Sequence, residues 1–173
     1  DGQIFLETEL FHSGVVPAVN PGISVSRVGG SAQIKAMKKV ASKLKLLYSQ
    51  YIELKSFAQF GSDLDADTKE RLALGERIVE ILKQDKSSPV PVEKQVAIIY
   101  AATNGYLNDV KVPDVSAYEK EFYEFLDLRY SDLLDIVRKT GKLEDSGFET
   151  LAEACREFTE KFRREHYHIT SEN

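Results

Sequence analysis

Arg27 is the side chain of this sequence that is best placed to do chemistry outside its own segment. It lies in Ile23–Gly30, which reads ISVSRVGG. Ile23 and Val25 alternate with serines, a pattern that predicts a short strand, and the two glycines predict that the strand ends beside Arg27. A side chain at such a strand end is presented rather than buried. We therefore expect the Arg27 guanidinium to reach a group outside this segment.

A guanidinium in that position suits phosphoryl transfer. The transition state spreads negative charge over the equatorial oxygens, and an arginine offered by a neighbouring subunit can add about 10³ to 10⁵ in rate. That factor corresponds to about 4 to 7 kcal/mol of transition-state stabilisation. A lysine at the same position would keep the charge but lose the planar fork of donors.

The sequence contains no other group of residues with the spacing of a catalytic, phosphate-binding or metal-binding site. It has no G-x-x-x-x-G-K-[ST] phosphate loop, and Gly29 and Gly30 cannot replace one, because the lysine and the hydroxyl that must follow are missing. The acidic turn Ser62–Asp67 lacks the central glycine and terminal glutamate of a calcium loop, and we expect Asp67 to cap a helix instead. Cys155 is the single cysteine and matches a core position. We therefore predict no metal site and no triphosphate site within this segment.

The composition describes a globular piece of a longer protein. Of the 173 residues, 42% are hydrophobic and 29% are charged, which suffices for one ordinary domain with a core. The sequence has no run of about eighteen apolar residues to span a bilayer, and it begins without a signal peptide or an initiating Met. The net charge of −5 argues against nucleic acid as the main partner, since such binding needs clustered positive charge.

One basic stretch stands out against this acidic balance. After the glycines no acidic residue occurs before Glu53, and lysines crowd the interval. Two interpretations stay open: a solvated helix face, or a face toward an acidic neighbour in an assembly. The lysines concerned are Lys35, Lys38, Lys39, Lys43 and Lys45.

The chain as a whole predicts a mainly α fold. Gln3–Phe11 reads as a strand and His12–Pro21 as a loop, and we expect them to close the edge of a sheet whose other strands lie upstream. Beyond Gly30, apolar residues recur at steps of three and four, which predicts five helices in a bundle or superhelix. The first four expected helices run from Ser31 to Gly61, from Asp67 to Lys86, from Pro91 or Val92 to Gly105, and from near Ser116 to Gly141. We expect the third of these to be the most buried. The fifth helix holds Leu151, Cys155, Phe158 and Phe162. We expect the polar tail His166–Asn173 to fray.

Several long stretches of this sequence resemble the alpha subunit of the F-type rotary ATP synthase. The resemblance covers nearly the whole chain. The matching stretches read DGQIFLETELF at Asp1–Phe11, PAVNPGISVSRVGGSAQIKAMKKVA at Pro17–Ala41, FAQFGSDLDADT at Phe57–Thr68, GERIVEILKQ at Gly75–Gln84 and VEKQVAIIYAATNGYL at Val92–Leu107.

The resemblance implies two parts with different roles. Residues 1–30 would be the C-terminal edge of a RecA-like nucleotide-binding domain, and residues 31–173 the C-terminal helical domain. Arg27 falls on the arginine finger that the alpha subunit extends into the catalytic site of the adjacent beta subunit. The turn between the first two helices of residues 31–173 would face the central rotor. The implied ligands are ATP or ADP with magnesium in the intact complex, none of them held by this segment alone, which would hydrolyse nothing in isolation.

A second nucleotide site follows only from the resemblance. The alpha subunit has a non-catalytic site whose adenine pocket uses an Arg-Pro pair and the glutamines of a K-Q-x-Q segment. Pro17 and Gln84 match this pattern, whereas Val16 and Lys86 stand where the arginine and the second glutamine are expected. We therefore expect Pro17 and Gln84 as adenine contacts, and we do not expect tight binding.

The implied assembly has three alpha and three beta subunits around the gamma rotor, with the delta subunit or peripheral stalk reached through the rest of alpha. It would lie on an energy-transducing membrane, at the cytoplasmic face in bacteria or its mitochondrial or plastid equivalent, and couple proton flow to ATP synthesis or hydrolysis. Two alternatives stay open. One is a freestanding all-helical protein-interaction module without a nucleotide role, and the other is a paralogue such as the beta subunit or a secretion ATPase.

Overall fold

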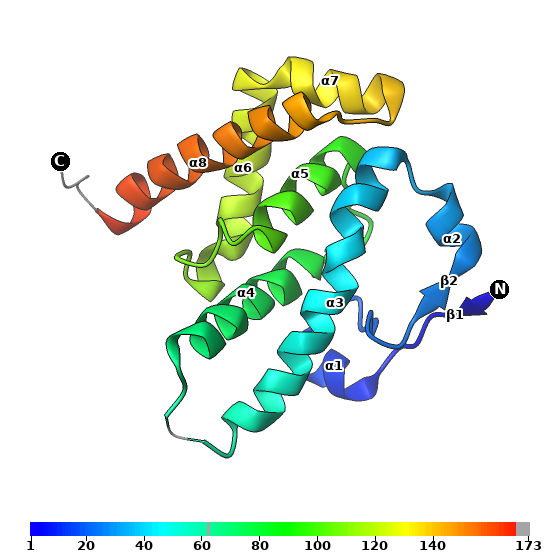
Figure 1. Ribbon diagram of the computed structural model, residues 1–173, viewed down its shortest axis with the longest axis vertical. Coiled ribbons are helices and arrows are strands. Elements are labelled where there is room, and N and C mark those ends of the chain that lie inside the picture. The colour runs from blue at the N-terminus through cyan, green and yellow to red at the C-terminus, as the bar shows by residue number, and fades with distance from the viewer. Residues whose placement is uncertain (62, 169–173) are drawn as a thin grey trace.

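The structure, a computed structural model, describes residues 1–61 and 63–168 and is mainly α-helical, as predicted (Figure 1). A short N-terminal segment lies beside a bundle of longer helices. The N-terminal elements are β1 (Gly2–Gln3), α1 (Thr8–His12), β2 (Val25–Ser26) and α2 (Arg27–Ala32). The bundle consists of α3 (Lys35–Ala58), α4 (Ala66–Leu82), α5 (Val92–Thr103), the 3₁₀ turn η1 (Val112–Asp114), α6 (Val115–Arg129), α7 (Ser131–Thr140) and α8 (Asp145–Tyr167).

The N-terminal segment contains less strand than the sequence predicts. The prediction of a strand over Gln3–Phe11 is wrong beyond Gln3: β1 pairs antiparallel with β2, an isolated bridge joins Leu6 to Val19, and Thr8–His12 is helical. A two-stranded ribbon without a third strand is marginal. Past Glu7 the backbone groups pair within a turn of helix instead, with the Phe11 N–H donating to Glu7 O and the Ser13 N–H to Glu9 O.

The first two long helices form an antiparallel hairpin whose ends differ from the predicted ones. Ser31 does not cap α3, because it lies inside α2, and α3 ends at Ala58 rather than at Gly61. Asp65, not Asp67, caps α4: its Oδ1 accepts the Thr68 N–H at 2.7 Å. A capping side chain reaches the amide three residues on, and Asp67 already lies in the first turn.

The predicted helix from near Ser116 to Gly141 is two helices in the structure. Tyr130 breaks it between α6 and α7, with φ −132° and ψ 31°. The Tyr130 hydroxyl donates to Glu157 Oε2 of α8 at 2.9 Å, and its ring packs on Phe125 at 5.7 Å. The predicted end at Gly141 is confirmed, because Gly141 adopts a left-handed φ of 67° there.

The core gathers around α5 and around an aromatic cluster between α6 and α8. Val96, Ala97, Ile98 and Ala101 of α5 are buried, as predicted for the third helix. Cys155 is also buried, as predicted, and burial raises the pKa of its thiol. The aromatic cluster, in which each ring contacts at least one other, consists of Tyr118, Phe122, Phe125, Phe158 and Phe162.

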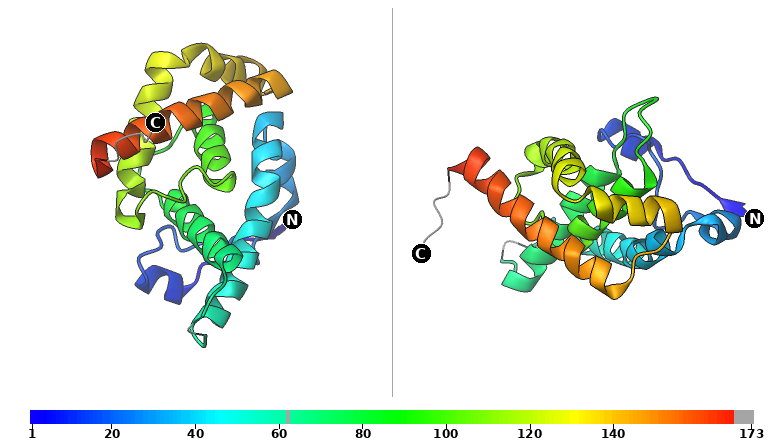
Figure 2. Two further views of the ribbon diagram at one scale, coloured as in Figure 1. Left: turned by 60° about the vertical axis from the view of Figure 1, so that its left-hand side comes forward. Right: turned by 90° about the horizontal axis from the view of Figure 1, so that it is seen from above.

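The N-terminus and the C-terminal end of α8 lie on opposite sides of the bundle (Figures 1 and 2). The expected fraying from His166 is wrong for the first residues of the tail, because α8 continues to Tyr167. The His166 ring stacks on Phe162 with 4.0 Å between centroids, and its Nε2 lies 3.1 Å from the Glu121 carboxylate. The rest of the predicted tail, residues 169–173, falls outside the described residues. Within residues 1–61 and 63–168, no helix combines the length and apolar character needed to cross a membrane.

Candidate functional site

Arg27 is the first residue of α2 and points away from the protein. Its side chain is 88% exposed. The two glycines after it are helical rather than looped, because Ser26 caps α2: the Ser26 Oγ accepts the Gly29 N–H at 2.9 Å. A Cβ at Gly29 would lie 2.9 Å from that same Oγ, so a larger residue there would make the Ser26 side chain shift. The predicted strand end beside Arg27 is therefore confirmed, and the segment after it is a short helix.

Asp1 holds the start of α2 but leaves the guanidinium free. Its Oδ2 accepts the Ser26 hydroxyl and the Val28 N–H, both at 2.9 Å. The nearest approach to Arg27 joins Asp1 Oδ1 to Arg27 Nε at 3.8 Å, beyond hydrogen-bond distance. Exposed pairs of this kind contribute little, so the Arg27 fork keeps its donors available to another group.

Apolar side chains are exposed around Arg27 and along the rest of the N-terminal segment. Neighbouring Val25 and Val28 are 50% and 67% exposed. So many large apolar side chains exposed in one short segment are unusual, because exposed apolar residues on a monomer are normally scattered singly. The other exposed apolar residues of the segment are Ile4, Phe5, Leu6, Phe11, Val16 and Ile23.

The two residues expected at a second nucleotide site lie near each other but face different hollows. The Gln84 N–H donates to Val16 O at 3.0 Å, which joins the end of α4 to the residue before Pro17. Gln84 and Lys86 line an open groove of about 630 Å³. Pro17 instead lines a separate, mostly apolar cavity of about 170 Å³ between the N-terminal segment and α3.

Two residues of the larger groove, Glu119 and Tyr123, were not predicted to belong to any site. Glu119 accepts the Tyr123 hydroxyl at 2.6 Å, and burial raises the pKa of the Glu119 carboxyl, partly opposed by that hydrogen bond. The spacing of four residues places both side chains on one face of α6, which is the signal that the sequence carried. The Gln84 amide is engaged as well, since its Nε2 donates to Ser88 O at 3.1 Å.

Exposed aromatic side chains mark the far end of the α3–α4 hairpin. Phe57 and Phe60 are 69% and 91% exposed. Nothing in the apolar periodicity singled out Phe60, because it follows the last turn of α3. The lysines after the glycines lie along α3 and are all exposed. Among the described residues, no group of three or more His, Cys, Asp or Glu side chains is placed to hold a metal ion.

Comparison with known proteins identifies the helical part of the chain. Residues 33–158 match the family model described as ATP synthase alpha/beta chain, C terminal domain. This chain belongs to that family. The predicted resemblance is thereby confirmed, and the membership explains why the bundle is helical from α3 onward.

Two relatives extend the match over the N-terminal segment. ATP synthase subunit alpha, sodium ion specific, of Acetobacterium woodii is 57% identical over 164 residues, which are 95% of this chain and 33% of the relative. ATP synthase subunit alpha of Salinibacter ruber is 56% identical over 162 residues, which are 94% of this chain and 29% of the relative. The chain thus spans about a third of the length of these relatives.

Proposed function

We propose that this chain is the C-terminal part of a rotary ATP synthase alpha subunit and that Arg27 acts on a phosphoryl group bound by an adjacent beta subunit. Residues 1–30 would end the nucleotide-binding domain, and residues 31–173 would form the helical domain. The observation that carries the proposal is the Arg27 guanidinium itself, which is 88% exposed at the start of a capped helix. The two relatives named as alpha subunits support it.

The chemistry of Arg27 follows from its position. The Ser26 cap and the Asp1 carboxylate fix the backbone at the start of α2, while the side chain stays free to reach outward. Two parallel N–H donors of a guanidinium match two equatorial oxygens of a transferring phosphoryl group. Because the charge on those oxygens grows in the transition state, the arginine stabilises that state more than the bound ATP. ATP and its magnesium ion would be held by the neighbouring subunit.

The exposed apolar surface of residues 1–30 favours this role over a freestanding helical module. Such a module would gain nothing from leaving Phe5, Leu6 and Val28 in water. In an alpha subunit, the upstream domain and the adjacent beta subunit would cover them. The chain would then be a peripheral component of a membrane-bound complex.

The end of the α3–α4 hairpin is the surface we propose for the gamma rotor. Phe57 and Phe60 are exposed there, and Asp63 and Asp65 add negative charge beside them. An apolar and acidic tip can slide against a rotor surface that offers apolar and basic side chains in turn. Peripheral-stalk contacts would lie on the part of the alpha subunit that precedes this chain.

We also propose a weak non-catalytic nucleotide site at Gln84 and Pro17. The groove beside Gln84 has the volume for an adenine, but the Gln84 amide already donates to Ser88 O, and Val16 offers no cation. Binding of ATP to the intact alpha subunit, measured by equilibrium dialysis, should be weak. Tight binding that Gln84→Ala abolishes would contradict the weakness and confirm the location.

The experiment that tests the main proposal uses the assembled complex. Arg27→Lys should lower multi-site turnover about 10³-fold or more, with assembly and nucleotide binding retained. Arg164→Lys is the matched control, because Arg164 is also exposed but lies on α8. Turnover in the Arg27→Lys complex equal to that of the control would refute the role of Arg27.

A further inference from the structure

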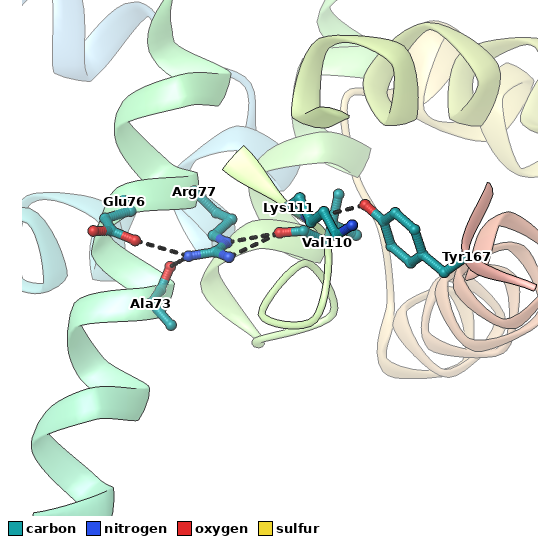
Figure 3. Close-up of polar contacts among 6 residues, drawn as sticks. All are labelled: Ala73, Glu76, Arg77, Val110, Lys111 and Tyr167. Atoms are coloured by element: carbon teal, nitrogen blue, oxygen red, sulfur yellow. Dashed lines mark hydrogen bonds and ion pairs between the residues drawn. The ribbon is translucent and has the colours of Figure 1, made fainter. Parts of the chain in front are cut away.

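The guanidinium of Arg77, on α4, hydrogen-bonds to a backbone carbonyl oxygen in the loop that precedes α6 (Figure 3). Its side chain is only 12% exposed. Nε and Nη2 both donate to Val110 O, at 3.0 and 2.9 Å. Nη1 donates to Ala73 O at 3.2 Å and to Glu76 Oε2 at 2.9 Å. The guanidinium is therefore locked onto α4 on one side and onto the loop on the other.

The hydroxyl of Tyr167, at the C-terminal end of α8, hydrogen-bonds to the backbone of the next residue of the same loop. The Lys111 N–H donates to the Tyr167 hydroxyl oxygen at 2.9 Å, and that hydroxyl donates to Asp114 Oδ2 at 2.7 Å. Burial and the hydrogen bond to Asp114 raise the pKa of Tyr167, so the hydroxyl keeps its proton and makes both bonds. The Lys111 ammonium lies 5.0 Å from the centre of the Tyr167 ring and adds a cation–π contact.

The Val110 carbonyl and the Lys111 N–H are the two ends of one peptide group. A peptide group is planar and rigid, so its two ends move together. A charged donor on the oxygen also polarises the group and strengthens the N–H as a donor. The Val110 side chain is fully buried, which anchors this group in the core.

We propose that the peptide group between Val110 and Lys111 is a latch that couples α4 to the C-terminal end of α8. Arg77 binds its oxygen and Tyr167 binds its N–H, so loss of either contact weakens the other. Among the described residues, two other ion pairs tie this end of α8 to the rest of the bundle, and both lie near the surface: Arg163 Nη1 is 3.4 Å from Asp109, and His166 Nε2 is 3.1 Å from Glu121. Helix ends held by few buried contacts open locally at low free energy. The latch therefore sets how readily the last turns of α8 open when α4 shifts.

Hydrogen exchange of the full chain in its assembly tests the latch. Arg77→Gln should speed exchange in residues 110–114 and 163–167 by about tenfold, the factor expected from one lost buried hydrogen bond, and leave α7 unchanged. Tyr167→Phe keeps the ring and should have the same effect. Because both substitutions open one latch, the double variant should exchange no faster than about the faster single variant.

Two control variants, and the exchange rate of α4 in the Tyr167→Phe variant, complete the test. Arg156→Gln on α8 and Arg71→Gln on α4 change exposed side chains outside the latch and should leave exchange at the wild-type rate. Tyr167→Phe should also speed exchange of the α4 amides around Arg77. This measurement tests the latch even if the Arg77→Gln variant fails to fold. The latch is overturned if Tyr167→Phe leaves α4 at the wild-type rate, or if the double variant shows the product of the two single effects.

Discussion

Glu119 shows how burial alone can make one side chain control the pH dependence of stability. Its carboxyl is half-buried on α6, and desolvation raises its pKa above the ordinary value. The folded state therefore keeps the proton over a pH range where the unfolded state has released it. The free energy of unfolding must then fall as pH rises from the ordinary carboxyl pKa through the raised one.

Glu119→Gln should remove that fall, because the amide cannot ionise and still accepts the Tyr123 hydroxyl. The variant should be more stable than the parent above the window and equal to it below. Urea denaturation between about pH 4 and pH 8 measures this. Glu124→Gln, on the exposed side of the same helix, should follow the parent. The same pH slope in Glu119→Gln and in the parent would contradict the assignment.

At the residue scale, the position of Arg27 just after a strand was predictable, because alternating residues followed by two glycines form a local pattern. The roles of Arg27 and Gln84 stay predictions. The prediction that Asp67 caps α4 was wrong. The two aspartates look alike in the sequence, and only the structure shows that the Asp65 carboxylate accepts the Thr68 N–H. The burial of Glu119 was not predictable, because it depends on the groove that residues of α4 and α6 line together. Such residues depend on contacts far apart in the chain, and no local pattern specifies them.

The α3–α4 hairpin depends on one close approach between its helices. Gly75 of α4 is buried against Tyr51 of α3, and a Cβ at Gly75 would lie 2.2 Å from Tyr51 Cγ. No real side chain tolerates that distance, so the helices would have to separate.

Gly75→Ala should therefore lower the free energy of unfolding by about 1 to 3 kcal/mol. Gly30→Ala is the matched control, since Gly30 lies in α2 with no atom within 4 Å of an added Cβ. That change should be neutral or stabilise by up to about 1 kcal/mol through helix propensity. Urea denaturation of both variants decides the point, and equal midpoints would contradict the packing argument.

At the element scale, the ends marked by special residues were predictable and the break at Tyr130 was not. Gly141 ends α7 in a left-handed conformation, which the sequence signals directly. Around Tyr130 the apolar period runs on through Phe125 and Leu133 without proline or glycine. The break forms because the Tyr130 hydroxyl and ring bind α8 and α6, and such tertiary contacts override local propensity.

At the scale of the whole molecule, the buried core lies in the helical bundle and not in residues 1–30. No residue of 1–30 is buried, and the core begins at Ala36. The N-terminal segment was expected to be the edge of a sheet and not to fold alone, and its exposed apolar side chains fit that expectation. Its short strand content could not be predicted, because strands form only with partners.

Deleting residues 1–30 should leave a chain that still unfolds cooperatively. The free energy of unfolding should fall by about 1 to 2 kcal/mol, mainly because Tyr48 and the other α3 side chains that line the apolar cavity lose the cover of the N-terminal segment. Circular dichroism during urea titration measures both cooperativity and stability. A broad transition without a cooperative midpoint would show that residues 31–173 are not a domain.

The central claim is that Arg27 serves the transition state on a neighbouring subunit, and nucleotide binding to the assembled complex tests it most directly. ADP with aluminium fluoride and magnesium mimics the transferring phosphoryl group, whereas magnesium ATP represents the ground state. In the Arg27→Lys complex, affinity for the mimic should fall by about 10³ or more, while affinity for ATP stays within about threefold of the parent. Unchanged affinity for the mimic would contradict the account.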